Sequence, residues 1–296
     1  MDSRVLVIGD FILDHDVFCD VVGLSLETPT LKGTFSNERF LYGGAANVVE
    51  HLLALGSPVA FLTGVAVDNY TETVLNFGKH PSLDLRPLNY EGQNLIKSRY
   101  WAKRGSKVYK YFQLNRGSKA DNSQLLSAMD KMSLESFDKA VLVDYGNGMF
   151  SSADHTQKII SKLRENNISV FSSCQKSSRD ITYEPFRGSD LICMNDYEAL
   201  SAAKLLSLSD IGMLSKHLES DLCVTSGPKG STYHSGNETV SYKALQVDCV
   251  DSCGAGDAFL AAMVLKEDCV FANKWAALSV TKQGTEVPTL EDLDEL

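Results

Sequence analysis

The feature that most constrains this chain is a glycine loop near its C-terminus, where residues 251–259 read DSCGAGDAF. The segment from Tyr242 to Val250 predicts a strand before the loop, and the apolar run from Ala258 to Leu265 predicts a helix after it. Two glycines, Gly254 and Gly256, flank Ala255, so the backbone can turn sharply and approach a ligand closely. The free N–H groups at the start of the helix would then point at a negative charge. The pattern predicts an anion-binding site.

Asp257 ends this loop at the start of the predicted helix. We expect the positive end of the helix dipole to lower the pKa of this carboxyl and keep it ionised. An ionised carboxylate beside a bound phosphate can accept a proton from a hydroxyl, which is the geometry of phosphoryl transfer. A helix-capping aspartate after a glycine turn is the alternative explanation.

Length and composition narrow the class of protein. The 296 residues suffice for one large α/β domain or two small ones. With 28 Lys and Arg against 38 Asp and Glu, the net charge of -10 argues against binding to nucleic acid or to anionic membranes. The sequence has no signal-peptide pattern and no apolar run near the ~20 residues of a membrane span, so we expect a cytoplasmic protein. The seven cysteines and six histidines are scattered, which predicts reduced thiols and no zinc site.

Two further motifs lie upstream, GDFILD (Gly9 to Asp14) after a predicted first strand and GGAAN (Gly43 to Asn47) before a predicted helix. Together with DSCGAGDAF they resemble the signatures of the ribokinase-like (PfkB) carbohydrate kinases, from about Val5 to about Thr285. The resemblance implies a single kinase domain over residues 1–296 with a three-layer α/β fold. Its central sheet would be mostly parallel, with helices on both faces and a small β-sheet lid.

The resemblance assigns the sugar site to these upstream motifs. A carboxylate such as Asp14 accepts two or more hydrogen bonds from sugar hydroxyls at fixed geometry. Without the resemblance, Asp14 would be equally well explained as a solvated loop residue, and GGAAN as the turn that opens a helix. The implied substrate-binding residues are Asp10, Asp14, Gly43, Gly44 and Asn47.

Two segments, at about residues 12–40 and 94–115, are rich in β-forming residues and are expected to form the lid. The second segment predicts two strands joined at Gly105 and Ser106. In several related kinases two such lids pair, so the resemblance implies a homodimer in which the aromatic lid surface is hidden.

The second lid segment is also basic, since eight of the 28 Lys and Arg residues lie between Lys97 and Lys119. These residues would either keep an edge strand soluble or bind a phosphate already present on the sugar. Arg99 and Arg116 are the candidates for the phosphate-binding role.

The nucleotide half of the site is implied by a T-x-G-x-x-G loop and by an N-x-x-E pattern, although any helix N-terminus can begin with N-x-x-E. The resemblance implies ATP and Mg²⁺, with Glu198 holding the cation through water and Asn195 near the phosphates. It places Asn273 against adenine and makes Asp251 a candidate ligand for a monovalent cation such as K⁺. The implied nucleotide-binding residues are Asn195, Glu198, Thr225, Gly227, Gly230 and Asn273.

Within the family, GGAANV and the DYGNG ending of a predicted strand (Asp144 to Gly148) look most like the branch that phosphorylates a heptose 7-phosphate. The product would be a 1,7-bisphosphate for lipopolysaccharide or capsule precursors. That branch often carries a nucleotidyltransferase domain after the kinase, and because this chain stops at Leu296 we expect that activity to reside elsewhere.

The chain departs from that branch at two places. Where the branch usually reads D-P-K-G, this chain has SSCQK, so an acid is missing near Ser173 and Lys176 is displaced by one residue. An arginine common in the branch is also absent between Gly23 and Pro29.

These departures leave other activities open. The alternatives are a kinase for another sugar or a nucleoside, and a sugar- or nucleotide-binding protein that has lost catalysis. A dehydrogenase is excluded because no G-x-G-x-x-G follows the first strand. In the expected reaction, Asp14 and Asn47 orient a sugar hydroxyl, Asp257 takes its proton, and the backbone N–H groups of residues 254–256 stabilise the transferred phosphoryl group.

Overall fold

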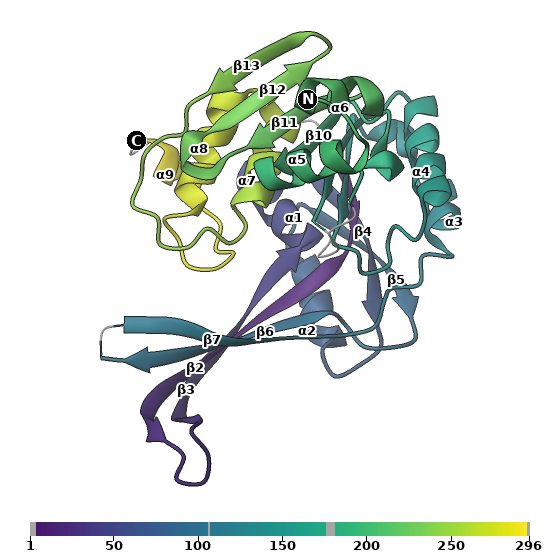
Figure 1. Cartoon of the computed structure of the whole chain (residues 1–296). Coiled ribbons are helices and arrows are strands. Elements are labelled where there is room, and N and C mark those ends of the chain that lie inside the picture. Colours follow the sequence, from purple (N-terminus) through teal and green to yellow (C-terminus); the bar gives the residue numbers. More distant parts are fainter. Residues whose placement is uncertain (1–3, 106, 176–180, 295–296) are drawn as a thin grey trace.

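The computed structural model describes residues 4–105, 107–175 and 181–294, which contain two β-sheets (Figure 1). The larger sheet has nine strands in the order β13-β12-β11-β10-β9-β8-β1-β4-β5. Neighbouring strands pair in parallel from β11 through β10, β9, β8, β1 and β4 to β5. At the other edge, β12 pairs antiparallel with both β11 and β13. Its strands are β1 (Val5–Gly9), β4 (Val59–Ala66), β5 (Leu83–Tyr90), β8 (Lys139–Asp144), β9 (Ser169–Cys174), β10 (Leu191–Asn195), β11 (Asp221–Thr225), β12 (Ser231–Ser235) and β13 (Glu238–Tyr242).

The central strands bury both of their faces. In β1, Val5 and Val7 join one hydrophobic cluster, while Leu6 and Ile8 join a second cluster on the opposite face. This alternation follows from the two-residue period of a strand, and burial on both sides explains the continuous apolar run in the sequence.

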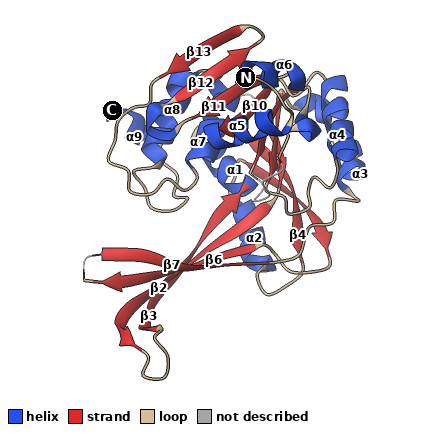
Figure 2. Ribbon diagram, in the orientation of Figure 1, coloured by secondary structure: helices blue, strands red, loops and turns tan. Residues whose placement is uncertain are grey.

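Helices cover both faces of the large sheet, as Figure 2 shows. One face is covered by α1 (Ala45–Ala54), α7 (Ala255–Lys266) and α8 (Cys269–Ser279). The other is covered by α3 (Leu125–Asp130), α4 (Ala153–Glu165), α5 (Asp196–Leu205) and α6 (Ile211–Leu218). Two short helices, α2 (Thr71–Asn76) and α9 (Leu290–Asp294), complete the layers. The predicted three-layer α/β arrangement is confirmed.

The smaller sheet, here called the lid, extends away from the large sheet (Figure 1). Its strand order is β3-β2-β6-β7, so the two predicted lid segments pair with each other, through parallel β2 and β6. Leu13 at the base is fully buried, whereas Leu24 near the tip is 61% exposed. The predicted turn residue Ser106 lies outside the described residues. The strands are β2 (Phe11–Leu24), β3 (Leu31–Gly44), β6 (Ile96–Arg104) and β7 (Lys107–Arg116).

One predicted strand is wrong. The chain leaves β13 at Tyr242, and residues 243–249 have no regular secondary structure. Part of this segment, including Leu245 and Val247, lines a cavity, so its apolar side chains are accommodated without a partner strand. The Gln246 side chain donates instead to the backbone oxygen of Pro228, at 3.0 Å.

Within the described residues, no helix is both long and apolar enough to cross a membrane.

Candidate active site

The parallel strands deliver the site residues to one edge of the large sheet. Because β1, β8, β9, β10 and β11 run in the same direction, the residues that follow them meet at their shared carboxyl edge. A cavity of about 360 Å³ lies there. Its lining includes Asp14, Lys97 and Arg99 from the lid, Tyr145, Gln175 and Asn195 from strand ends, and residues 252–257 from the glycine loop and the start of α7.

The glycine loop turns into α7 at Gly254, whose φ of 79° is in the left-handed region. A Cβ atom on Gly254 would lie only 2.6 Å from Asn47 Nδ2, so a side chain does not fit there. The loop and the first turn of α7 form one wall of the cavity, and the first N–H groups of a helix have no intrahelical partner. The Ala255 N–H contacts the Ser252 backbone oxygen at 3.4 Å, and the anion-binding role of Gly254, Ala255 and Gly256 stays a prediction.

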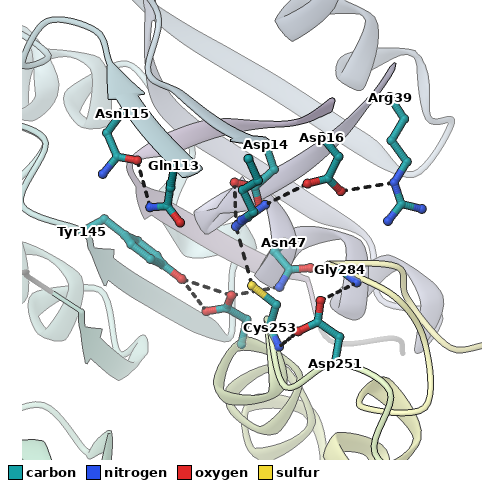
Figure 3. A network of polar contacts seen from close by, with 12 residues as sticks. Asp14, Asp16, Arg39, Asn47, Gln113, Asn115, Tyr145, Asp251, Cys253 and Gly284 are labelled. Atoms are coloured by element: carbon teal, nitrogen blue, oxygen red, sulfur yellow. Dashed lines mark hydrogen bonds and ion pairs between the residues drawn. The ribbon is translucent and has the colours of Figure 1, made fainter. Parts of the chain in front are cut away.

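Asp257 is buried beneath the cavity, and three side chains donate to it. Asn47 Nδ2 lies 2.9 Å from Oδ2, and the Tyr145 hydroxyl lies 2.9 Å from Oδ1 and 3.1 Å from Oδ2. Gln175 Nε2 lies 3.3 Å from Oδ1. Tyr145 and Asn47 approach this carboxylate from separate elements (Figure 3).

Burial raises the pKa of Asp257 to about 6, against the lowering effect of the hydrogen bonds from Asn47 and Tyr145. The expectation that the helix dipole would lower this pKa is wrong, because removing the carboxylate from water has the larger effect. A carboxyl with a pKa near 6 is ionised at neutral pH and is basic enough to accept a proton from a bound hydroxyl.

On the lid side of the cavity, Arg99 and Asp14 form a buried ion pair, with Arg99 Nη2 3.1 Å from Asp14 Oδ1. Two other buried polar atoms near the cavity, Asn47 Oδ1 and Thr285 Oγ1, have no hydrogen-bond partner among the described residues. An unsatisfied buried polar atom is rare and indicates a missing ligand or water. The arrangement suits a ligand that carries several hydroxyl groups.

Gly43 and Gly44 lie at positions where neighbouring atoms leave no room for a side chain. A Cβ on Gly43 would lie 2.7 Å from Asp14 Oδ2, and one on Gly44 would lie 2.5 Å from the backbone oxygen of Asp10. Of the two, Gly44 lines the cavity. Both glycines therefore let the end of β3 lie close to Asp10, which links β1 to β2, and to Asp14 in β2.

Asp10 is placed differently from its predicted role. It is buried and lies outside the cavity lining, and its carboxylate accepts hydrogen bonds from the backbone N–H groups of Tyr145 (2.9 Å), Asn147 (3.1 Å) and Met149 (3.1 Å). Asp10 thus fixes the loop that carries Tyr145. Burial raises the pKa of Asp10 to about 6, with Asp144 contributing.

A second cavity, of about 200 Å³, adjoins the first across the glycine loop. The two cavities share Thr225, Gly227 and the start of α7. The second is lined mainly by apolar groups from α8 and from residues 244–249, and Gly230 and Asn273 also lie in its wall. Asn273 Nδ2 donates to Ser231 Oγ at 2.9 Å. Its size and apolar character suit a planar base beside the anion site.

Asn195 and Glu198 form a reciprocal capping box at the start of α5, with both hydrogen bonds at 2.8 Å. Glu198 Oε2 also accepts from the Tyr183 hydroxyl, at 3.1 Å. Both residues line the first cavity, and burial raises the pKa of Glu198. One carboxylate in the wall of the predicted phosphate site fits Mg²⁺, which commonly retains several waters and takes one or two protein carboxylates.

Two other residues that were predicted to bind ligands, Asp251 and Arg116, form hydrogen bonds within the chain. The carboxylate of Asp251 accepts from Cys253 N at 3.0 Å and from Gly284 N at 3.1 Å, so it ties the glycine loop to the segment after α8 (Figure 3). Arg116 is exposed on the lid and donates to the Tyr70 hydroxyl at 2.8 Å. It is not among the residues that line the cavity, whereas the neighbouring Lys97 is.

Sequence reasoning missed the site positions of Tyr145, Gln175, Lys97 and Thr285. A signal existed for the first two, because each directly follows a parallel strand, Tyr145 after β8 and Gln175 after β9. The noted Lys176 lies outside the described residues, and Gln175 is the side chain that approaches Asp257.

The fold and the two adjoining cavities define the class of protein as a phosphotransferase that acts on an alcohol group. The chain matches the sequence profile described as "pfkB family carbohydrate kinase" over residues 2–292, and it belongs to that family of sugar kinases.

Curated relatives include the bifunctional protein HldE of Nitratiruptor sp., which is 28% identical over 315 residues covering 100% of this chain. HldE of Helicobacter pylori (strain HPAG1) is 29% identical over 316 residues covering 98% of this chain. This chain spans 65% of the length of each of these two relatives.

Solved structures confirm the ribokinase-like fold. Ribokinase from Thermotoga maritima superposes with a TM-score of 0.75 at 17% identity, covering 99% of this chain and 98% of that one. Phosphofructokinase-2 from Escherichia coli in complex with potassium gives a TM-score of 0.78 at 16% identity, covering 100% of this chain and 98% of that one.

Proposed function

We propose that this chain transfers the γ-phosphoryl group of ATP to a hydroxyl of a heptose 7-phosphate, forming a 1,7-bisphosphate for lipopolysaccharide or capsule precursors. The observation that carries the kinase proposal is the position of Asp257. Its buried carboxylate lines the first cavity at the start of α7, directly after Ala255 and Gly256, which line both cavities, and it accepts a hydrogen bond from Asn47. The heptose assignment is supported by the DYGNG motif at the end of β8 and by Lys97 and Arg99 in the cavity wall.

In this mechanism the sugar lies between the lid and Asp257. The Asp14 carboxylate and Asn47 Oδ1 accept hydrogen bonds from its hydroxyls, and the reacting hydroxyl gives its proton to Asp257 as its oxygen attacks the γ-phosphorus. The bond from the γ-phosphorus to the bridging oxygen breaks, and ADP leaves. The N–H groups at the start of α7 stabilise the negative charge on the phosphoryl oxygens. Glu198 would hold Mg²⁺ through water, and the metal would neutralise phosphate charge.

One observation favours a second class of substrate, an acceptor that carries no phosphate. The charge of Arg99 is already opposed by Asp14 at 3.1 Å and Asp16 at 3.9 Å, and Arg116 lies away from the cavity. Lys97 is therefore the basic lid side chain in the cavity wall that has no assigned ion pair among the described residues. A kinase for an unphosphorylated sugar or a nucleoside has no substrate phosphate to bind, so it would need no cation in the cavity wall beyond these.

The test is release of ADP, measured with a coupled assay, with Mg-ATP and a panel of hexoses, pentoses, nucleosides and heptose 7-phosphates. Turnover only with a heptose 7-phosphate is the expected result. Turnover only with another sugar would overturn the heptose assignment and keep the kinase. No turnover with any acceptor, together with ATP binding, would favour a protein that has lost catalysis. Repeating the panel in K⁺ and in Na⁺ tests whether a monovalent cation activates the enzyme.

The lid supports a further proposal, a homodimer formed by two lids. Exposed large side chains gather on β3 and β7, among them Phe35, Tyr109, Tyr111 and Phe112. Burying such a surface is favourable, and lid pairing would cover it. A monomeric mass in sedimentation at micromolar concentration would contradict this proposal.

A further inference from the structure

The side chain that contacts both oxygens of Asp257 is Tyr145. Its hydroxyl lies 2.9 Å from Oδ1 and 3.1 Å from Oδ2, whereas Asn47 contacts Oδ2 and Gln175 contacts Oδ1. A donor shared between both oxygens limits rotation of the carboxylate about its Cβ–Cγ bond. Tyr145 therefore fixes the plane of the group that has to accept the proton.

Asp10 holds the backbone of Tyr145 and of the loop around it in place. The carboxylate of Asp10 accepts the backbone N–H of Tyr145 and those of Asn147 and Met149 in the same loop. Gly148, at a φ of 117°, lets that loop pack against Ala120, since a Cβ there would lie 2.4 Å from the Ala120 backbone oxygen. The loop after β8 is thus fixed to Asp10 by three hydrogen bonds and packs against Ala120, and the phenol reaches Asp257 from a rigid support.

The Tyr145 phenol also stays protonated between pH 6 and pH 8, so it remains a hydrogen-bond donor over this range. Burial, together with the neighbouring Asp257 carboxylate, raises the pKa of Tyr145 well above its usual value. A protonated phenol stabilises the ionised form of Asp257 relative to the protonated form. Losing this hydrogen bond would therefore make the base harder to ionise.

From this geometry we infer that Tyr145 is a positioning residue for phosphoryl transfer, whose hydroxyl holds the Asp257 carboxylate facing the acceptor hydroxyl. The inference rests on the proposed function, since it gives Asp257 the part of general base. During the reaction the acceptor hydroxyl would then hydrogen-bond to the Asp257 carboxylate while Tyr145 still donates to that carboxylate. Gln175 and Asn47 would then remain as the flanking donors.

The variant that tests the inference is Tyr145→Phe, which removes one oxygen and retains the ring. We expect the acid limb of the kcat/KM profile to move to higher pH by about 0.5–1 unit, because a stabilising hydrogen bond to the carboxylate is lost. We expect kcat to fall about tenfold at pH 8, where Asp257 is ionised in both proteins, because the carboxylate is less well oriented, and about two- to fivefold further near pH 6, with the KM for ATP unchanged. A purely structural role predicts the same loss at every pH, and that result would overturn the inference.

The matched control is Tyr233→Phe. The Tyr233 hydroxyl also donates to a carboxylate, that of Asp221 at 2.6 Å, but neither residue lines the first cavity. We expect this variant to keep the wild-type pH profile.

A readout without turnover separates this inference from the proposed function. The Asp257 carboxyl is titrated by ¹³C NMR, with its signal assigned from its absence in Asp257→Asn. A higher pKa of Asp257 in Tyr145→Phe than in the wild type supports the inference even if no sugar in the panel reacts. An unchanged pKa overturns it whether or not the chain is a kinase.

Discussion

Asn47 Nδ2 donates to Asp257 Oδ2 at 2.9 Å, and this buried hydrogen bond joins residues 210 positions apart in the sequence. Asn47 lies in the first turn of α1, which follows the lid strand β3, and Asp257 lies in the first turn of α7. The bond therefore links the part of the site proposed to bind the sugar to the residue proposed as general base. The oxygen of the same amide, Asn47 Oδ1, has no partner among the described residues.

Replacing this amide tests the link. We expect Asn47→Ala to lower kcat about 10- to 100-fold and to raise the KM for the sugar, because one donor to the base and one contact to the acceptor are lost together. Steady-state kinetics with the sugar that reacts in the panel measures both constants. The exposed Asn237→Ala serves as the control. A variant with wild-type kcat and KM would separate Asn47 from the reaction.

The pKa of Asp257 makes a prediction about pH. Burial raises this pKa to about 6, and a general base must be ionised to accept a proton. The kcat/KM should therefore be level above about pH 7 and fall by about tenfold per unit below pH 6, since the ionised fraction falls at that rate. A profile that stays flat down to pH 5 would show that the base has a much lower pKa or is another group.

The lid cations can be tested as a pair. Lys97 lines the cavity and Arg116 lies outside it on Tyr70. If the sugar carries a phosphate, we expect Lys97→Ala to raise the KM for that sugar about tenfold or more, because a charge-assisted contact to the phosphate is lost. Arg116→Ala should leave this KM within about twofold. Equal effects of the two substitutions would mean that the cavity does not select the phosphate.

Glu50 predicts a dependence of stability on pH that is separate from catalysis. It lies on α1 beside a cavity of about 780 Å³, and burial raises its pKa from 4.5 to about 8. The folded state therefore binds a proton that the unfolded state releases between these two pH values, so Glu50 makes stability decline as pH rises from about 4.5 to about 8.

The isosteric variant Glu50→Gln removes that decline. At pH 8 we expect it to be more stable than the wild type by about 1–3 kcal/mol, less than the pKa difference alone implies, because the cavity admits water to the carboxylate. At pH 4.5 the two proteins should be nearly equal. Urea unfolding at both pH values measures the difference, and parallel pH dependences in the two proteins would contradict the assignment.

Much of the fold could be predicted because its signals are local. The apolar strands and the capped helix α4 have short-range patterns, and the glycine loop before α7 requires backbone conformations that only certain residues adopt. The segment after Tyr242 shows the limit of this approach. Its apolar residues resemble a strand, but a cavity accommodates them instead.

The site was harder to predict because its contacts are long-range. Tyr145 and Gln175 approach Asp257 only after five parallel strands bring their carboxyl ends to one edge. The pKa of Asp257 depends on how deeply the packed chain buries it, and no spacing in the sequence gives that quantity. Asp10 is similar, since its motif predicts a ligand-binding acid while its three backbone partners lie in a loop more than a hundred residues away.

The measurement that tests the central claim most directly is ADP formation from Mg-ATP and the acceptor sugar by wild type, Asp257→Asn and Asp138→Asn. Asp138 is an exposed carboxylate just before β8, at the opposite edge of the sheet. We predict that Asp257→Asn lowers kcat by about three orders of magnitude or more with little change in sugar affinity, and that Asp138→Asn matches the wild type. A kcat for Asp257→Asn within tenfold of wild type would remove Asp257 from the mechanism and contradict the account.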